Sequence, residues 1–274
     1  MSTDDAKISA DAHATPGDHL DMAKMPGHWA LARIGKRVLR PGGIEMTRRL
    51  LAALDVQSCD HVVEFAPGLG MTARMTLRLN PASYTAIERD KTAAARVARY
   101  LDGPNRRCVT GSAEATGLDD ACATVVYGEA MLTMQTAEQK RRIVQEAVRL
   151  LRKGGRYGVH EICLVPEDIE RSTVESIERD LAAAIHAGVR PLTMSEWRGL
   201  FTSAGLDIEA EATNPFHLLE PARVIRDEGV LGAMRIAFNV LRDREARKRV
   251  LEMRRAIRRH AEHMRAVMLV GVKP

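Results

Sequence analysis

The spacing of hydrophobic residues changes along the chain and predicts where its elements lie. Residues 1–20 are polar and show no periodic apolar face, so we expect a mobile arm. Apolar side chains then recur every three to four positions from Trp29 to Leu39 and from Met46 to Leu54, and a Pro-Gly-Gly break separates the two runs. This spacing predicts two helices before the first strand.

From residue 61 onward, short β-rich apolar runs alternate with helical segments. Such an order is typical of a parallel sheet that helices cover on both faces. We predict strands at residues 61–65, 83–87, 107–110, 123–128, 156–164, 206–212 and 266–272. A capping box of Thr136 and Gln139 starts one of the helices between them, which we expect to stop at Gly154-Gly155. A helical stretch over about 221–263 precedes the last strand.

Composition and charge narrow the possible functions. The 274 residues are 45% hydrophobic, 28% charged and 4% aromatic, and the formal net charge is +5. Residues 242–260 alone hold nine basic and three acidic residues, so the rest of the chain is close to neutral. A nucleic-acid partner would be expected to leave a broader basic surface and more aromatic residues.

The four cysteines do not have the spacing of a metal site or a redox pair. We therefore expect no metal and a reducing cytoplasm. The N-terminus lacks the pattern of a secretion signal, and no apolar run approaches the ~20 residues that cross a bilayer.

A glycine turn follows the first predicted strand and carries the clearest chemistry. Gly68 and Gly70 would let the backbone approach a nucleotide-like ligand, and Glu64 ends the strand beside that crevice. Glu88 ends the next strand, where a carboxylate can accept hydrogen bonds from both ribose hydroxyls. Because Gly68, Gly70 and Ala73 also satisfy the G-x-G-x-x-A dinucleotide pattern, the turn by itself leaves a dehydrogenase open.

The turn resembles the first motif of the class I S-adenosylmethionine-dependent methyltransferases, an acidic residue followed by three alternating glycines. Glu64 matches the acid, Gly68 and Gly70 match the second and third glycines, and Ala66 replaces the first. We expect alanine to be compatible there if its φ is negative. Glu88 matches the ribose-binding acid of the family.

The resemblance extends along the chain in the order the family requires. Gly111-Ser112-Ala113-Glu114 resembles the Gly-Asp-Ala-Glu segment beside the adenine, with Ser112 in place of aspartate, and residues 150–156 resemble the turn before the fifth strand. It implies a Rossmann-like α/β fold with a seven-stranded, mostly parallel sheet whose last strand is antiparallel. It also implies S-adenosylmethionine as cofactor, with binding residues Glu64, Ala66, Gly68, Gly70, Glu88, Arg89, Ser112, Ala113 and Glu129.

The catalytic candidates lie near the ends of the fourth and fifth strands. Methyl transfer from a sulfonium depends mainly on positioning, and a base is needed only for a protonated nucleophile. His160 is the first candidate for that base, with Glu161 and Tyr127 as further candidates, although His160 could equally be a hydrogen-bonded structural residue. His28 and Trp29 could close over the cofactor. No Asn-Pro-Pro-Tyr or Asp-Pro-Pro-Tyr tetrad follows the fourth strand, which argues against amide or base N-methylation.

These features favour methyl transfer to an O, C or S atom of a small molecule, in a layout resembling the ubiquinone/menaquinone-biosynthesis branch. Two alternatives stay open: an RNA or DNA methyltransferase that uses the basic helix, and an inactive cofactor-binding scaffold. Homodimer formation is also open. The expected parts are the arm at 1–20, a helical lid at 21–58, a cofactor-binding core at 59–212 plus 264–274, and a helical cap at 213–263.

Overall fold

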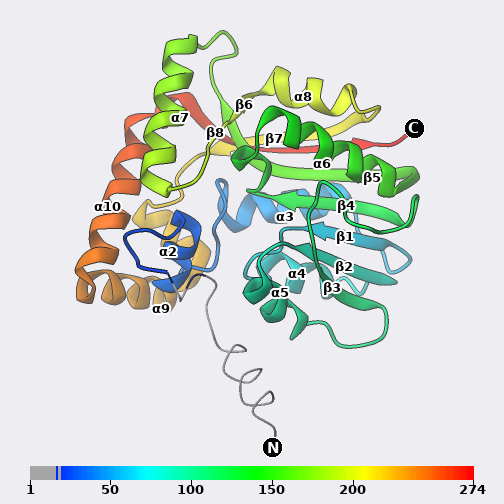
Figure 1. The fold of residues 1–274 in the computed structure, drawn as a ribbon, viewed down its shortest axis with the longest axis horizontal. Helices are drawn as coiled ribbons and strands as arrows, with labels where there is room; N and C mark the ends of the chain where they lie inside the picture. The colour runs from blue at the N-terminus through cyan, green and yellow to red at the C-terminus, as the bar shows by residue number, and fades with distance from the viewer. Residues whose placement is uncertain (1–16, 18–19) are drawn as a thin grey trace, which may run out of the picture.

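A computed structural model describes residue 17 and residues 20–274, and the predicted arm falls almost entirely outside this range. One sheet organises the molecule (Figure 1), with strands in the order β3-β2-β1-β4-β5-β8-β7. The strands are β1 (His61–Phe65), β2 (Ser83–Glu88), β3 (Arg106–Thr110), β4 (Ala123–Glu129), β5 (Leu151–Leu164), β6 (Leu192–Thr193), β7 (Asp207–Pro215) and β8 (Met264–Val272).

The pairing confirms the predicted α/β fold and adds one strand. The first five strands pair in parallel, whereas β8 runs antiparallel to both of its neighbours, β5 and β7. The additional strand, β6, has two residues; it lies off this path and pairs with Cys163 and Leu164 at the end of β5. A strand of two residues is too short to leave an alternating pattern in the sequence, so the prediction of seven strands missed it.

Helices cover both faces of the sheet and form a further group beyond one end of its strands (Figure 1). Their bounds are α2 (Gly27–Arg33), α3 (Gly43–Leu54), α4 (Met71–Leu77), α5 (Lys91–Ala98), α6 (Ala137–Leu150), α7 (Arg171–Ile185), α8 (Met194–Thr202), α9 (Pro221–Arg242) and α10 (Arg244–Arg259), with short 3-10 turns at Leu132–Met134 and Ala261–His263. Among them, α6 begins with the predicted capping box of Thr136 and Gln139.

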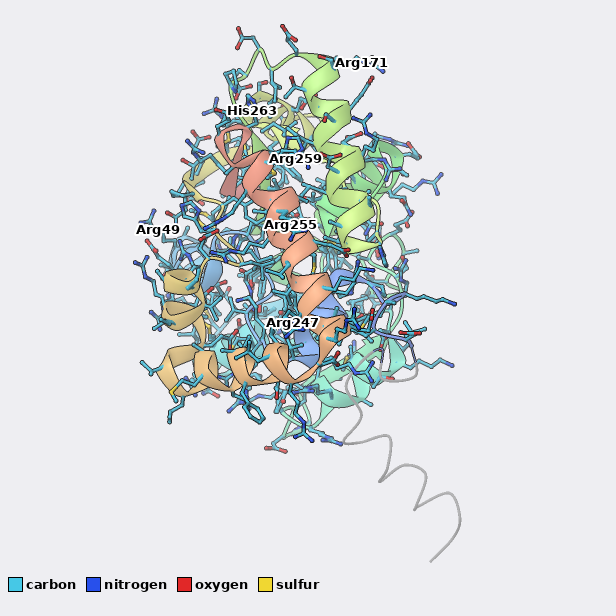
Figure 2. The ribbon with its side chains drawn as sticks, turned by 90° about the vertical axis from the view of Figure 1, so that its left-hand side faces the viewer. Arg49, Arg171, Arg247, Arg255, Arg259 and His263 are labelled. Atoms are coloured by element: carbon cyan, nitrogen blue, oxygen red, sulfur yellow. The ribbon has the colours of Figure 1, made fainter. Side chains whose placement is uncertain are left out.

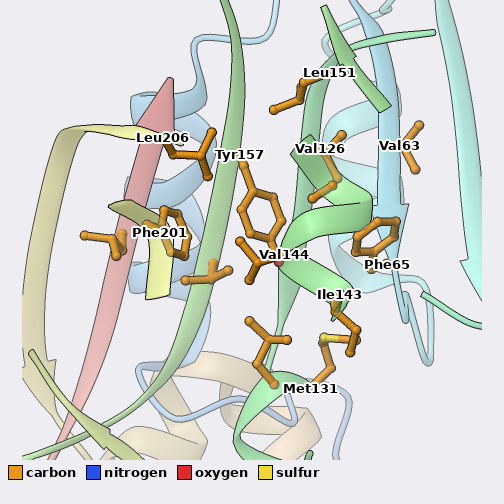
Figure 3. Packing of buried hydrophobic residues seen from close by; sticks show 14 of the residues in the cluster. Val63, Phe65, Val126, Met131, Ile143, Val144, Leu151, Tyr157, Phe201 and Leu206 are labelled. Atoms are coloured by element: carbon orange, nitrogen blue, oxygen red, sulfur yellow. The ribbon is translucent and has the colours of Figure 1, made fainter. Parts of the chain in front are cut away.

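Two apolar clusters fix the sheet between its helices. On one face, Ile143, Val144 and Phe201 from α6 and α8 pack against strand residues such as Tyr157, whose ring stacks on Phe201 with centroids 5.1 Å apart (Figure 3). On the other face, buried residues of α3, α4 and α5 pack against β1, β2 and β4. The sheet is therefore buried on both sides, as its continuous apolar runs predicted.

A third cluster joins α2, α7, α9 and α10 beyond the carboxyl ends of the parallel strands. Figure 2 shows α10 running beside α7, and α9 crossing below them. Long helical repeats in the sequence predicted α7 and the helical stretch before the last strand. Within that stretch, Asp243 ends α9 and caps α10 by accepting a hydrogen bond from the Ala246 N–H at 3.0 Å.

Two predicted helix ends are wrong. The first helix stops at Arg33, so Val38 and Leu39 lie in the non-helical segment before α3, which we call the strap (residues 34–42). Its apolar residues fit a helical repeat, but Glu228 binds the strap backbone in another conformation. The helix α6 stops at Leu150, before Gly154-Gly155, because Leu151 already pairs with Ala123 of β4.

Candidate active site

A cavity of about 760 Å³ opens at the carboxyl ends of the parallel strands. One side is formed by the segments after β1, β2, β3 and β4, and the other by α2, α7, α10 and residues 216–219. Ligands of open α/β sheets bind at this edge, because the loops there vary while the sheet holds them in place. The cavity therefore lies where the sequence placed the cofactor crevice.

The glycine turn after β1 borders this cavity with left-handed backbone conformations. Gly68 (φ 56°) faces open space, since a Cβ built there would meet no atom within 4 Å. Gly70 (φ 74°) does not line the cavity; a Cβ there would lie 2.9 Å from the Tyr100 ring. Ala66 lines the cavity with φ 50°, so the expectation of a negative φ at this alanine was wrong. The turn thus keeps the backbone shape of a glycine motif at all three positions.

Glu64 presents a buried carboxyl group to the cavity from the end of β1. Its Oε2 accepts hydrogen bonds from the hydroxyls of Tyr84 and Tyr127, the latter at 2.6 Å. Burial raises the pKa of Glu64 to about 7, even though both hydroxyls favour the charged form. A carboxyl group with this pKa is poised to ionise when a cationic ligand group arrives.

Tyr127 does not occupy the position that the sequence suggested. Its side chain is fully buried and does not line the cavity. Its hydroxyl contacts Glu64 and lies 2.6 Å from the Thr76 hydroxyl, and burial raises the pKa of Tyr127 well above its ordinary value. The predicted acid or base therefore acts as a support that orients Glu64.

Glu88 closes the turn from the end of β2. Its carboxylate accepts hydrogen bonds from the N–H of Gly68 at 3.0 Å and of Asp90 at 2.9 Å. Burial raises its pKa, whereas the two backbone donors favour the charged form. Glu88 and Arg89 both line the cavity, and so do Ser112 and Ala113 from the segment after β3. The Ser112 hydroxyl accepts a hydrogen bond from the Glu114 N–H at 3.2 Å.

Glu129 lines the cavity from the end of β4, but its oxygens are occupied by protein donors. One oxygen accepts from the Thr47 hydroxyl and the His160 imidazole, and the other from Thr72 and Arg40. Burial opposes its ionisation, yet Arg40 and these donors outweigh that effect and lower the pKa of Glu129 to about 2. The carboxylate therefore binds the strap and α3 to the core, which leaves it little capacity for a ligand.

The predicted base His160 is fully buried and does not line the cavity. Its Nε2 accepts a hydrogen bond from the Gly42 N–H at 2.9 Å, so its Nδ1 carries the proton that is donated to Glu129 at 2.8 Å. Both ring nitrogens are thus occupied. In this arrangement His160 has no free lone pair to accept a substrate proton, which agrees with the hydrogen-bonded alternative that the sequence left open.

Glu161 is also occupied. Its carboxylate accepts hydrogen bonds from the backbone N–H groups of Met131, Leu132 and Thr133 and from the Thr133 hydroxyl, at 2.7 to 3.0 Å. Burial raises its pKa, while these four donors favour the charged form. Although Glu161 belongs to the cavity wall, its carboxylate fixes the loop after β4 and offers no free acceptor to a substrate.

The opposite end of the cavity is apolar. It is lined by residues from four separate segments, namely Leu31, Leu181, Ile185, Val189, Phe216, Leu218, Leu219, Met253 and Ile257. His28 and Trp29 also line the cavity, with ring centroids 4.5 Å apart. Burial lowers the pKa of His28 to about 4, so its ring is neutral at pH 7.

Sequence reasoning missed two groups of residues here. Arg40, Thr47 and Thr72 join the strap, α3 and α4 to Glu129, although they lie 57 to 89 positions from it in the sequence and belong to no motif. The apolar wall was also missed, because Leu181 and Met253 follow helical spacing, and a side chain that lines a cavity keeps the same spacing as one in a core. No signal in a single sequence separates these two cases.

Within residues 20–274, no cluster of three or more His, Cys, Asp or Glu side chains could hold a metal ion. The same part of the chain contains no helix with the length and apolar character needed to cross a membrane.

Comparisons with known proteins agree with this geometry. Residues 62–155 match a family model described as a methyltransferase domain. An uncharacterised protein of Haemophilus influenzae is 31% identical over 232 residues, which cover 82% of this chain and 90% of that protein. The domain match resolves the choice that the glycine turn left open between a methyltransferase and a dehydrogenase.

Solved structures share the fold at low sequence identity. The [4+2]-cyclase SpnF is 15% identical with a TM-score of 0.66, and the match covers 91% of this chain and 97% of that chain. A putative sarcosine dimethylglycine methyltransferase from Galdieria sulphuraria is 16% identical with a TM-score of 0.64, covering 84% and 83%. Geranyl diphosphate C-methyltransferase from Streptomyces coelicolor is 16% identical with a TM-score of 0.59, covering 84% and 78%. With the sheet order, the glycine turn and the domain match in agreement, this chain belongs to the class I methyltransferases, the family of enzymes whose cofactor is S-adenosylmethionine.

Proposed function

We propose that this enzyme transfers the methyl group of S-adenosylmethionine to an uncharged, largely apolar small molecule. The observation that carries the proposal is the unlike character of the two ends of the cavity. The core contributes Glu64, Glu88 and Ser112 to one end, whereas α2, α7, α10 and residues 216–219 contribute apolar side chains to the other. Quinone-like acceptors, which the layout of the sequence suggested, fall within this substrate class.

The residues of the polar end fit the cofactor. The open backbone at Gly68 leaves room for a ligand where a Cβ would project, and Glu88 beside it could accept hydrogen bonds from ribose hydroxyls. Ser112 and Ala113 would lie along the adenine, and the buried carboxyl group of Glu64 would face the cationic methionine part. The bound cofactor supplies a methyl carbon that its sulfonium has already activated.

The apolar end supports an uncharged acceptor, because the charged groups nearest to it already have protein partners. Glu161 is held by four donors, and Arg40 is paired with Glu129. Arg37 is paired with the buried Glu228. A charged substrate would have to give up its hydration without gaining a free counter-ion here, which costs several kcal/mol.

Positioning is the main catalytic contribution in this proposal. The side chains first considered as bases do not offer a free proton acceptor, since His160 and Tyr127 lie outside the cavity and Glu161 is fully hydrogen-bonded. Walls that align donor and acceptor can supply ~7 to 11 kcal/mol of the barrier without a base. An uncharged carbon or sulfur nucleophile suits such a site, because it needs neither a base nor a counter-ion.

Four arginines of α10 are engaged within the protein, which limits the basic surface that RNA or DNA could contact. Arg254 and Arg258 pair with Glu220, Arg259 pairs with Asp180, and Arg249 is buried with its guanidinium on backbone carbonyls. Nucleic-acid binding depends on arginines that are free to contact phosphates. The same helix contributes Met253 and Ile257 to the cavity, in keeping with a cap that selects the acceptor.

Calorimetry and a panel of acceptors test the proposal. S-adenosylhomocysteine should bind the wild-type chain, and methyl transfer should be found among apolar phenols, quinols and enols but not among charged amines or oligonucleotides. Transfer to a charged acceptor or to RNA would contradict the acceptor class. If the chain binds the cofactor but methylates no acceptor, and if substitutions in the cavity leave cofactor binding unchanged, the scaffold alternative would be favoured instead.

A further inference from the structure

Large apolar side chains lie exposed along the C-terminal half of α9. Val230, Leu231, Met234, Phe238 and Leu241 are 61% to 82% exposed. Apart from the adjacent pair Val230 and Leu231, they recur every three to four residues, which places them on one side of the helix. With Ile225, α9 holds six of the eight exposed large hydrophobic residues in the described part of the chain. We call the five residues from Val230 to Leu241 the α9 apolar face.

The opposite side of this half-helix attaches it to the protein. Ile236 is buried in the cluster with α2 and α10, and Val240 packs against that cluster. The Asn239 side chain donates a hydrogen bond to the Ile34 carbonyl at 3.0 Å. Gly229, with φ 74° and ψ 168°, bends α9 just before this half. The preceding residue, Glu228, is buried. The helix is thus firmly seated while its apolar face points away from the core.

Basic side chains flank the α9 apolar face. Arg235 and Arg242 are exposed on the same helix, and Arg244, Arg247 and Lys248 are exposed at the start of α10. Among the described residues, these five form no ion pair within 4.0 Å. Figure 2 shows Arg247 where the two helices meet, with Arg255 and Arg259 further along α10. Acidic residues are fewer here, since Asp243 and Glu245 are the two between residues 229 and 248.

We propose that the α9 apolar face docks onto an anionic lipid surface. Aromatic and aliphatic residues on one side of a helix, with arginine and lysine beside them, match the chemistry of helices that lie in the membrane interface. The apolar side chains would enter the boundary between headgroups and acyl chains. The basic flank would meet lipid phosphates, each such residue contributing through charge attraction that salt weakens.

Charge favours a lipid surface over a second copy of the chain. A two-fold contact would set the apolar face of α9 against itself and bring the five basic residues of each copy close to those of the other. A row of side chains one helix wide is also narrow beside the ~800 Å² that each partner buries in a standard interface. An anionic bilayer satisfies both the apolar face and its flank.

This docking does not depend on the identity of the methyl acceptor, because none of the five residues lines the cavity. Substitutions on the face can therefore be read apart from the chemistry. The test uses the full chain and vesicles of phosphatidylcholine with or without about one-third phosphatidylglycerol. Co-sedimentation should show binding to the anionic vesicles, weaker binding to the neutral ones, and release at high salt.

A pair of variants tests whether the α9 apolar face causes the binding to vesicles. Leu231→Gln with Phe238→Gln should reduce partition to anionic vesicles at least about tenfold, since two large apolar side chains are lost from the contact. Leu79→Gln, at a residue 43% exposed and outside α9, is the matched control and should bind as the wild type does. S-adenosylhomocysteine affinity should be the same in all three proteins, which shows that each is folded.

Two results would overturn the proposal. The first is that the full chain does not sediment with anionic vesicles, or that the double variant sediments as well as the wild type. The second is a concentration-dependent dimer in analytical ultracentrifugation that the double variant abolishes, which would assign the face to a second copy.

Discussion

Two alanines border the cavity in a conformation that alanine seldom adopts. Ala66, after β1, has φ 50°, and Ala130, after β4, has φ 54°. Each donates its N–H to a neighbouring strand at 2.8 Å, to the carbonyl of Ile87 and of His160 respectively. Left-handed φ costs an L-residue about 1–2 kcal/mol relative to glycine, and such strain gathers at functional sites. Hydrogen bonds to the sheet therefore hold both alanines in a left-handed turn conformation that alanine rarely adopts.

Replacing Ala66 with glycine should stabilise the protein. Relief of the left-handed strain exceeds the extra chain entropy of glycine, so we expect a gain of up to ~1 kcal/mol and a melting temperature higher by about 2 °C. Ala95→Gly is the matched control, because Ala95 is exposed within α5 and should lose about 0.5–1 kcal/mol. Equal destabilisation of both variants in thermal melts would refute the strain at Ala66.

The raised pKa of Glu64 predicts how stability changes with pH. Its value is about 7 in the folded protein and 4.5 in the unfolded chain, because burial disfavours the carboxylate. The stabilising contribution of the protonated form is complete below pH 4.5 and is lost as the pH rises through 7, in total up to about 3 kcal/mol. Glu64→Gln keeps an acceptor for Tyr84 and Tyr127 but does not ionise.

Melting temperatures between pH 5 and pH 8 check this prediction. The melting temperature of Glu64→Gln should rise relative to that of the wild type as the pH increases, with the largest difference near pH 8. Parallel curves for the two proteins would show that Glu64 does not titrate in this range. Glu129, whose pKa is lowered to about 2, should influence the curves only below pH 4.5, where it loses its own stabilising charge.

At the scale of elements, the N-terminal half of α9 holds the strap against the cavity. Glu228 accepts hydrogen bonds from the N–H groups of Arg37 and Val38 at 2.7 and 2.8 Å, and Asp227 accepts from the Ile44 N–H at 3.0 Å. Lys36 is 1% exposed, and its Nζ lies 3.8 Å from both carboxylates. A helix late in the sequence thus fixes a segment near its start.

Removing Glu228 should be among the most damaging single changes outside the cavity. Glu228→Ala leaves two strap N–H groups without a partner and Lys36 with only one counter-ion, so we expect a loss of about 3–5 kcal/mol. Glu245→Ala, at an exposed acid of α10 without an ion pair among the described residues, should change stability by less than ~0.5 kcal/mol. Similar urea midpoints for the two variants would show that the strap does not depend on Glu228.

Predictability also differed between elements. Strands β1, β2 and β4 were predicted within one residue, because four or five buried positions in succession leave a clear run in each sequence. The strap was not, because Val38 is buried and Leu39 is partly buried at a spacing that still fits a helix, while Glu228 of α9 binds the strap backbone. The local hydrophobic pattern indicates which residues are buried, but it does not indicate which elements bury them.

At the scale of the whole molecule, the proposed function assigns the core end of the cavity to the cofactor and the end formed by the outer helices to the acceptor. A substitution at the apolar end should therefore affect transfer without affecting cofactor binding. Leu218→Trp adds volume at a half-buried wall position, and we expect transfer to fall at least about tenfold while S-adenosylhomocysteine affinity stays within twofold. Leu79→Trp, outside the cavity, should leave both quantities unchanged.

A substitution at the polar end of the cavity tests cofactor binding. Glu88→Ala should weaken S-adenosylmethionine binding at least about tenfold, since hydrogen bonds to a charged acceptor contribute ~1.5 to 3 kcal/mol. Thermal melts must accompany the calorimetry, because Glu88 also binds Gly68 and Asp90. Unchanged affinity in a folded variant would refute the ribose assignment.

The sequence by itself determined the α/β order, the glycine turn, the acids at the ends of β1 and β2, and with them the family. These features are local: a strand, its turn and the next helix are contiguous, so the spacing of their residues is set by the chain. Only the tertiary structure decided that His160, Glu161 and Tyr127 are occupied by protein partners, and that Leu181, Phe216 and Met253 share one wall. Those outcomes depend on contacts between residues that can lie more than a hundred positions apart. Hydrophobic spacing does not indicate which distant group a side chain contacts.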